Sequence, residues 1–423
     1  MRFVFYLLFI FLPITECQQQ YYGHRVISIR TDDPEILDML VKWQNEGIDF
    51  WSKINKVGRP ITVRIPPILS KDFLDFLQSN DVPFDDIIPN LGNVMVTEEM
   101  TQNIARESRR ENTEGEYEVE FTYYWDTDEI GQFLAYLKGD YPERLIVTSG
   151  GKSYEGRDIY VVKISNTNFE GKKPKVFIDA GIHAREWIAP MVALYLIHQL
   201  VVNATEHAEL LAFDWIIIPC VNPDGYQYSH DYNRLWRKTR SVNKDNHCVG
   251  VDGNRNYGYR WGYGSPDSVN IDPCSETYLG PDPFSESETR TVANVMAQEI
   301  YNLELYISFH SYGGWILYPF AFDNRVPHPN KKEVDLLGNM VADVIYKATG
   351  RNYTVGNTAT LLYPASGGSD DNAAGNFDVD FTYTIELPGG GKHGFDLPGD
   401  QIVKVSEEIM IGMKVFLNYI LTT

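Results

Sequence analysis

Short apolar runs alternate with amphipathic segments from about residue 122 to the C-terminus, and this alternation restricts the fold more than any other feature of the chain. Four runs of six or seven residues are typical of strands, and the segments between them repeat apolar residues every three or four positions, as helices do. The predicted strands are 175–180, 214–220, 303–309 and 381–387, and two of the predicted helices are 187–201 and 286–299. The pattern predicts an α/β domain whose mixed sheet is flanked by helices.

A smaller unit is expected before this domain, because 423 residues exceed the size at which a single core usually keeps growing. Between about residues 22 and 106, strand-like and helix-like runs alternate and predict a small α+β domain. The strand-like runs are 24–29, 61–65 and 93–96, and the helix-like runs are 34–44 and 70–79. No cluster of residues in this unit suggests catalysis.

A polar stretch, 101–117, separates the two units and reads as a linker that contains the pair Arg109 and Arg110. The pair could be the solvated end of a helix. We favour a processing site for a trypsin-like protease, because proteolytic cleavage concentrates in exposed segments between folded units.

The N-terminus has the pattern of a cleavable secretory signal, with Arg2 followed by an apolar run, 3–12, and with Cys17 at the expected end of the segment 1–17. The run is too short to span a bilayer, which needs about 20 residues. We therefore expect a secreted, extracellular protein with no membrane partner. Asn203 and Asn352 then become glycosylation acceptors, since each begins an Asn-x-Thr triplet.

The formal net charge of -21 argues against nucleic acid as a partner and favours cationic substrates. Cys248 and Cys274 flank a polar loop and could close it as a disulfide in an oxidising compartment, whereas Cys220 lies in an apolar run and reads as a buried thiol. A monomer is the default expectation.

Residues with catalytic chemistry follow the predicted strands. His183 and Glu186 come directly after the strand 175–180, and three positions apart they can present an imidazole nitrogen and a carboxylate oxygen to one metal ion. His310, at the end of 303–309, is the histidine similarly placed to complete a zinc site. Glu386 ends the strand 381–387 on the face that carries its threonines, where a carboxylate could act as general base on a water.

With these residues in place, the chain resembles the zinc metallocarboxypeptidases of the A/B type over nearly its whole length. The motifs that carry the resemblance are His183-Ala184-Arg185-Glu186-Trp187, His310-Ser311-Tyr312, Asn222-Pro223-Asp224-Gly225, Arg234-Leu235-Trp236-Arg237-Lys238, Asp252-Gly253-Asn254-Arg255-Asn256, the run 363–369 and Thr384-Ile385-Glu386-Leu387. Their order along the chain makes chance agreement negligible.

The resemblance implies a role for each site residue. His183, Glu186 and His310 would hold one Zn²⁺ per chain, with Glu386 as general base and Arg237 stabilising the oxyanion. Asn254 and Arg255 would bind the terminal carboxylate of a peptide or protein substrate, and Tyr363 would close over it. Arg185, Ser311 and Tyr312 would line the neighbouring subsites. Cys248 and Cys274 resemble a disulfide that the family shares.

Asp370 stands where the family has an apolar residue in enzymes that remove apolar C-terminal residues and an acidic one in enzymes that remove basic residues. We therefore expect a carboxypeptidase B-like preference for C-terminal Lys or Arg. Two alternatives remain: Asp371 could face the pocket instead, or Asp370 could pair with a cation of the protein. Thr358 and Ala321 also depart from the small residue and the serine expected in the pocket wall, which predicts a narrower or less polar pocket.

The N-terminal unit resembles the family's inhibitory prosegment, so the expected organisation is a signal peptide (1–17), an activation prosegment (18–110) and a catalytic domain (111–423). Cleavage near Arg110 by a trypsin-like protease would release the prosegment. Selectivity for aromatic or aliphatic ends is the main alternative. A non-catalytic binding protein on the same scaffold is disfavoured, because all ligand and catalytic positions are intact.

Overall fold

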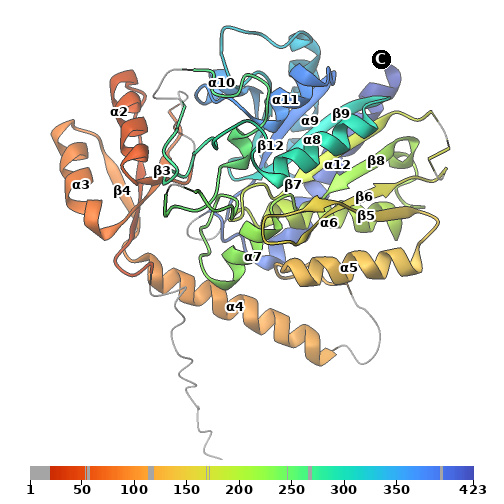
Figure 1. The fold of residues 1–423 in the computed structure, drawn as a ribbon, viewed down its shortest axis with the longest axis horizontal. Helices are drawn as coiled ribbons and strands as arrows, with labels where there is room; N and C mark the ends of the chain where they lie inside the picture. Colours follow the sequence, from red (N-terminus) through yellow and green to blue (C-terminus); the bar gives the residue numbers. More distant parts are fainter. Residues whose placement is uncertain are drawn as a thin grey trace, which may run out of the picture.

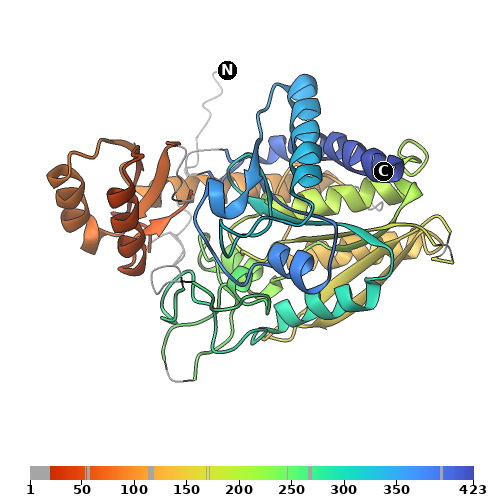
Figure 2. The ribbon, with the colours of Figure 1, turned by 90° about the horizontal axis from the view of Figure 1, so that it is seen from above.

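The computed structural model describes residues 20–423, with gaps at 53, 55–57, 113–118, 168, 171, 245, 265–268 and 391–393. The expected signal peptide, 1–17, lies outside this range. A small N-terminal unit lies against one side of a larger α/β unit, as Figures 1 and 2 both show. None of the helices in the described part of the chain combines the length and hydropathy that a membrane span requires.

The N-terminal unit is an antiparallel sheet covered by helices on one face. Its strands are β1 (Arg25–Ile29), β2 (Asp49–Phe50), β3 (Ile61–Ile65) and β4 (Phe84–Ile88), in the order β2-β3-β1-β4, with helices α2 (Pro34–Asn45) and α3 (Ser70–Ser79). Alternate residues of the strands, such as Ile27, Ile29 and Val63, form one buried core with Leu40 of α2 and Phe73 of α3. The predicted strands 24–29 and 61–65 and both predicted helices are present.

The strand predicted at 93–96 is wrong. These residues lie in a long helix, α4 (Leu91–Asn112), which also covers most of the predicted linker. Leu91, Val94 and Met95 are buried together. Their spacing of three and four positions is the helical period, which outweighs the strand-like composition of the short run.

Helix α4 runs along the larger unit beside α5 (Thr127–Asp140) (Figure 1). Glu98 accepts a hydrogen bond from Arg234 Nε at 2.7 Å, Gln102 accepts one from the backbone N–H of Tyr124, and Arg106 forms an ion pair with Glu129. Residues 98, 102 and 106 are spaced by four and therefore share one face of the helix. Arg109 and Arg110 fall near the C-terminal end of this docked helix, and processing there stays a prediction.

The larger unit contains a mixed sheet, as the sequence predicts. Its strands are β5 (Leu145–Lys152), β6 (Asp158–Ile164), β7 (Lys175–Ala180), β8 (Asp214–Ile218), β9 (Leu303–Ser311), β10 (Trp315–Tyr318), β11 (Thr354–Asn357) and β12 (Phe381–Leu387), in the order β11-β10-β12-β9-β7-β8-β6-β5. The central strands β12, β9, β7 and β8 are parallel to one another, and β6 and β10 run antiparallel to them on either side. The ends of the parallel strands consequently meet at one edge.

Helices cover both faces of this sheet. They are α5, α6 (Ile188–Val201), α7 (Pro223–Asp231), α8 (Ser287–Glu299), α9 (Lys331–Thr349), α10 (Thr358–Leu361), α11 (Ser369–Asn376) and α12 (Ile402–Thr422). On β7, Val176 and Ile178 join the core beneath α5, α6, α9 and α12, whereas Phe177 joins the core beneath α8 and α11. This alternation follows from the two-residue period of a strand.

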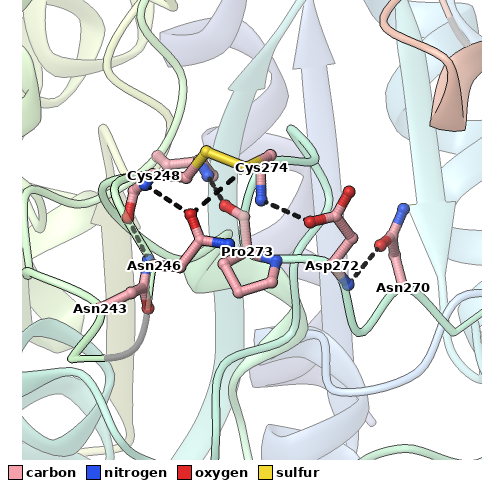
Figure 3. The surroundings of a disulfide bond; sticks show 8 residues. Asn243, Asn246, Cys248, Asn270, Asp272, Pro273 and Cys274 are labelled. Carbon is pink, nitrogen blue, oxygen red and sulfur yellow. Dashed lines mark hydrogen bonds between the residues drawn. A yellow bond between two sulfur atoms is a disulfide. The ribbon is translucent and has the colours of Figure 1, made fainter.

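Cys248 and Cys274 form a disulfide, with sulfur atoms 1.97 Å apart (Figure 3). Asn246 caps this corner of the loop, because its Oδ1 accepts a hydrogen bond from the backbone N–H of Cys248. The adjacent Pro273 carbonyl accepts a hydrogen bond from Lys238 Nζ at 2.7 Å. Cys220, the free cysteine among the described residues, is buried.

Replacing both disulfide cysteines by serine is expected to lower the free energy of unfolding by about 3 kcal/mol. Without the cross-link, the unfolded chain is no longer constrained to a closed loop of about 26 residues and gains conformational entropy. Urea unfolding of the double variant measures this change. The variant C220S, which breaks no disulfide, serves as the comparison. Equal stability of the double variant and the wild type would contradict the prediction.

Candidate active site

The residues singled out from the sequence gather where β7, β9 and β12 end. His183 and Glu186 lie in the turn between β7 and α6, and His310 lies near the end of β9. Glu386 is paired directly with His310 in the parallel register of β12 and β9. Sites in sheets of this kind form outside the carboxyl ends of the strands.

His183, Glu186 and His310 are all buried, and their ligand atoms lie within 4.8 Å of one another. Glu186 Oε1 is 2.8 Å from His183 Nδ1, and Glu186 Oε2 is 3.0 Å from His310 Nδ1. The two Nδ1 atoms are 3.2 Å apart. The backbone N–H of Ser311 also donates to Glu186 Oε2, at 3.0 Å, and so holds the carboxylate in place.

Asp252 orients the first of these histidines. Its Oδ1 lies 2.9 Å from His183 Nε2, and its Oδ2 accepts from Arg237 Nη2 at 2.9 Å. Arg237 and His183 hold the pKa of Asp252 well below its usual range despite burial, which acts in the other direction. The ionised carboxylate only accepts hydrogen bonds, so Nε2 of His183 carries the ring hydrogen.

The arrangement fits a zinc ion. Burial and the nearby Arg237 lower the pKa of His183, so its ring is neutral, and with the hydrogen on Nε2 the lone pair of Nδ1 points at the Glu186 carboxylate. Two electron-rich atoms at 2.8 Å repel each other unless a cation lies between them. Two imidazoles and one carboxylate, with an outer carboxylate fixing the ring, are the donor set of a catalytic zinc site.

The expected carboxylate clamp is assembled from two distant segments. Asn254 and Arg255 lie in a single 3-10 turn capped by Asp252, and Arg255 Nη2 lies 3.4 Å from the hydroxyl of Tyr363. Gly367 brings the segments together, because a Cβ at this residue would lie 2.2 Å from the backbone oxygen of Arg255. The φ of Gly367, 74°, also lies in the region that favours glycine.

Asp370 and Asp371 have different surroundings. Both carboxylate oxygens of Asp371 accept backbone N–H donors, from Ala321 at 2.6 Å and from Phe322 at 2.9 Å. Asp370 lies beside the clamp, since a Cβ at Gly368 would be 2.8 Å from Asp370 Oδ1 and 3.6 Å from Asn254 Oδ1. Burial raises the pKa of Asp370.

Thr358, one of the two expected wall residues of the pocket, donates its hydroxyl to the Tyr318 carbonyl at 3.3 Å. At the other end of the site, Tyr312 packs edge-on against Phe395, with ring centroids 4.9 Å apart. Arg185 places its guanidinium 4.8 Å from the centroid of the same phenyl ring.

Of the two expected glycosylation acceptors, Asn203 is half-buried and Asn352 is exposed, and glycosylation at each stays a prediction.

The N-terminal unit fills the cleft in front of these residues. Asp49 accepts hydrogen bonds from Arg185 Nη1 through both carboxylate oxygens, each at 2.9 Å, and Trp51 Nε1 donates to the same carboxylate. A cavity of about 30 Å³ remains between the two units, lined among others by Asp49, Arg237 and Glu386. That volume holds only a few water molecules and no peptide.

Residues 130–412 match the family model described as "Zinc carboxypeptidase", and residues 27–98 match the one described as "Carboxypeptidase activation peptide". The chain belongs to the zinc carboxypeptidase family. It is a zinc metallocarboxypeptidase produced as a zymogen, and its N-terminal unit is the activation peptide.

Relatives of both specificity types are similar to this zinc carboxypeptidase. Carboxypeptidase B of Astacus astacus is 40% identical over 72% of this chain and 99% of its own, and zinc carboxypeptidase A 1 of Drosophila melanogaster is 34% identical over 92% and 90%. The solved structure of carboxypeptidase A from Helicoverpa armigera matches with a TM-score of 0.86 and 32% identity, over 93% of this chain and 97% of that one.

Two residues at the centre of this carboxypeptidase site escaped the sequence analysis. Asp252 belongs to the motif 252–256, but the sequence analysis gave it no role. Its acidic side chain just before the Asn254-Arg255 pair was a signal that could have indicated one. Asp49 gave no signal at all, because its importance depends on a contact with Arg185, 136 positions away.

The variant D49N is expected to speed release of the cleaved activation peptide by about 10²-fold, because breaking a buried ion pair leaves Arg185 uncompensated. The appearance of activity after a trypsin pulse measures release. D86N, which removes a more exposed ion pair with Arg25 inside the activation peptide, is the matched control. Equal release rates for D49N and D86N would contradict the prediction that the Asp49–Arg185 ion pair slows release of the activation peptide.

The same ion pair predicts a pH dependence. Burial alone would raise the pKa of Asp49, but Arg185 and Arg64 outweigh burial and lower the pKa to about 2, from an ordinary value of 3.8. A carboxylate whose pKa is lowered on docking stabilises the docked state fully at pH values above its ordinary pKa. This stabilisation is lost as the pH falls through the lowered pKa. The contribution of the Asp49–Arg185 ion pair to docking should therefore be lost within the range from about pH 4 to pH 2.

Proposed function

We propose that this zymogen is secreted and, once a trypsin-like protease cuts near Arg110, removes C-terminal lysine or arginine from peptides and proteins. The observation that carries the specificity is the contrast between the two adjacent carboxylates. Both carboxylate oxygens of Asp371 accept backbone N–H groups, whereas Asp370 accepts the backbone N–H of Asp371 through Oδ1 alone and lies next to the clamp residue Asn254. Secretion is supported by the N-terminal apolar run and by the disulfide.

Asp370 favours a cationic ligand for a physical reason. A buried carboxylate without a cation is unfavourable, and burial raises the pKa of both Asp370 and the adjacent Asp371. A Lys or Arg side chain would compensate the charge, whereas an aromatic side chain would bury it further. Selectivity for aromatic or aliphatic ends is the alternative, and relatives named for both types match the chain.

In the mechanism we propose, His183, Glu186 and His310 would hold a zinc ion, which would supply Lewis-acid polarisation of the scissile carbonyl. Glu386 takes a proton from the attacking water and delivers it to the leaving amine. Arg237 stabilises the negative charge that develops on the carbonyl oxygen.

The remaining residues position the substrate. Asn254 and Arg255 bind the terminal carboxylate, which the planar guanidinium matches with two parallel hydrogen bonds. Tyr363 closes over it from the loop that ends at Gly368. Arg185, Ser311 and Tyr312 line the cleft upstream of the scissile bond, in the space that the activation peptide fills in the zymogen.

The test compares two peptides that differ only in a C-terminal arginine or phenylalanine, hydrolysed by the trypsin-treated protein. We expect arginine to be removed faster, activity to disappear with a zinc chelator and to return with added Zn²⁺, and peptides with an amidated C-terminus to resist hydrolysis. Faster removal of phenylalanine would retain the zinc chemistry and reject Asp370 as the determinant. Activity that survives chelation would reject the metal site, and activity without trypsin treatment would reject the proposed processing.

A further inference from the structure

Four residues form one row across the sheet, beginning at the active site and continuing away from the zinc ligands. The register pairs His310 with Glu386, Glu386 with Trp315, and Trp315 with Thr354. Directly paired residues of neighbouring strands point to the same face of a sheet, and each step is about 5 Å. Trp315 and Thr354 therefore extend the surface on which Glu386 lies.

A guanidinium group of the activation peptide occupies this extension. The Cζ atom of Arg59 lies 4.1 Å from the centre of the Trp315 ring. Its Nη1 donates to the Gly313 carbonyl at 3.3 Å, and its Nη2 donates to the Thr354 hydroxyl. A flat aromatic face with two oxygen acceptors at its rim can bind a guanidinium through a cation–π contact and two hydrogen bonds.

Trp315, Gly313 and Thr354 belong to the catalytic unit, and the site that they form is built into its fold. Trp315 packs on Leu317 and Leu362 beside Tyr363. Gly313 is required for the ring position, because a Cβ there would lie 2.2 Å from the indole. The backbone N–H of Thr354 donates to the Gly314 carbonyl at 2.9 Å, which fixes the third partner. Loss of the activation peptide removes Arg59 and leaves this arrangement in place.

We propose that Trp315, the Gly313 carbonyl and the Thr354 hydroxyl form a second basic subsite, which binds an arginine side chain upstream of the scissile bond once Arg59 has left. The subsite lies next to Ser311 and Tyr312, on the side where the substrate chain continues toward its N-terminus. It selects arginine over neutral side chains, so the activated enzyme favours peptides that carry an arginine upstream of the scissile bond. The inference rests on the proposed peptide hydrolysis, but not on the identity of the C-terminal residue.

The test uses pairs of N-blocked tetrapeptides that carry arginine or its neutral isostere citrulline at one of the three positions before the terminal residue. We expect the wild-type activated enzyme to show a roughly three- to tenfold higher kcat/KM for arginine at one of these positions, the range of a cation–π contact with hydrogen bonds. W315L keeps an apolar side chain but removes the aromatic face, and should abolish the preference. T354V keeps the shape and removes one acceptor, and should reduce the preference.

W315F is the conservative control, because it keeps an aromatic face and should retain part of the preference. The preference is the ratio of kcat/KM for the arginine and citrulline peptides within each variant, so a loss of activity shared by both peptides, for example through the packing of Trp315 beside Tyr363, cancels. The inference is overturned if wild type cleaves arginine and citrulline peptides equally at all three positions, or if W315L and T354V both keep the full preference. A preference for C-terminal phenylalanine would contradict only the proposed specificity. The subsite would still be tested, because arginine and citrulline can then be compared in peptides that end in phenylalanine.

Discussion

The variant E386Q is expected to lower kcat by about 10³-fold while changing KM little, because glutamine keeps the size of the side chain but cannot take a proton from water. Glu386 pairs in register with His310, a proposed zinc ligand, and lines the same cavity as Arg237. The loss should therefore fall on the chemical step. Steady-state kinetics of the trypsin-activated variant measures it, with zinc content and thermal unfolding as checks that the site is intact.

A glutamate elsewhere on the neighbouring strand provides the matched control for E386Q. Glu304 is the second residue of β9, lies six positions before His310 in the chain, and is partly exposed. E304Q should retain activity within about twofold, as surface substitutions away from special features usually do. A kcat for E386Q within tenfold of the wild type would exclude Glu386 as the general base.

The variant D370I is expected to lower kcat/KM for a C-terminal arginine by about 10²- to 10³-fold, because the substrate's cation then enters an apolar site without a partner. The same change should raise kcat/KM for a C-terminal phenylalanine, which reverses the order of the two substrates. Parallel measurements with both peptides give the ratio directly. No change in metal binding is expected.

The adjacent carboxylate separates specificity from stability. D371N disturbs the two contacts with the backbone N–H groups of Ala321 and Phe322, so it should lower the melting temperature and leave the substrate order unchanged. If D371N reverses the order and D370I does not, Asp371 is the determinant that faces the substrate.

The sequence predicted the parts of the fold that have a local signal. Both helices of the activation peptide and the strands around residues 175–180 and 381–387 are in place, because period and length agree over each segment. The strand prediction at 93–96 failed because four residues are too few to distinguish the helical period from the two-residue period of a strand. β10 and β11, four residues each, were also missed, although β10 carries Trp315.

The candidate site followed from residue type, order and resemblance, and the structure brings His183, Glu186 and His310 together as expected. Contacts between units could not be predicted in the same way. Asp49 with Arg185, and Arg59 with Trp315, join residues more than 130 positions apart in the chain. No local pattern marks Asp49 or Arg59, because their contacts depend on how the two units dock.

Asp252 makes three parts of the site share one carboxylate. It accepts hydrogen bonds from His183, from Arg237 and from the backbone N–H of Asn254. Substitutions of His183 and Arg237 should therefore be non-additive, because the first to displace Asp252 already weakens its other contacts. Double-mutant cycles between His183 and Arg237 variants should show a coupling energy, because both side chains contact Asp252. Mutations at one part of the site will then have effects that depend on which residue stands at another, so the order in which substitutions accumulate decides which are tolerated.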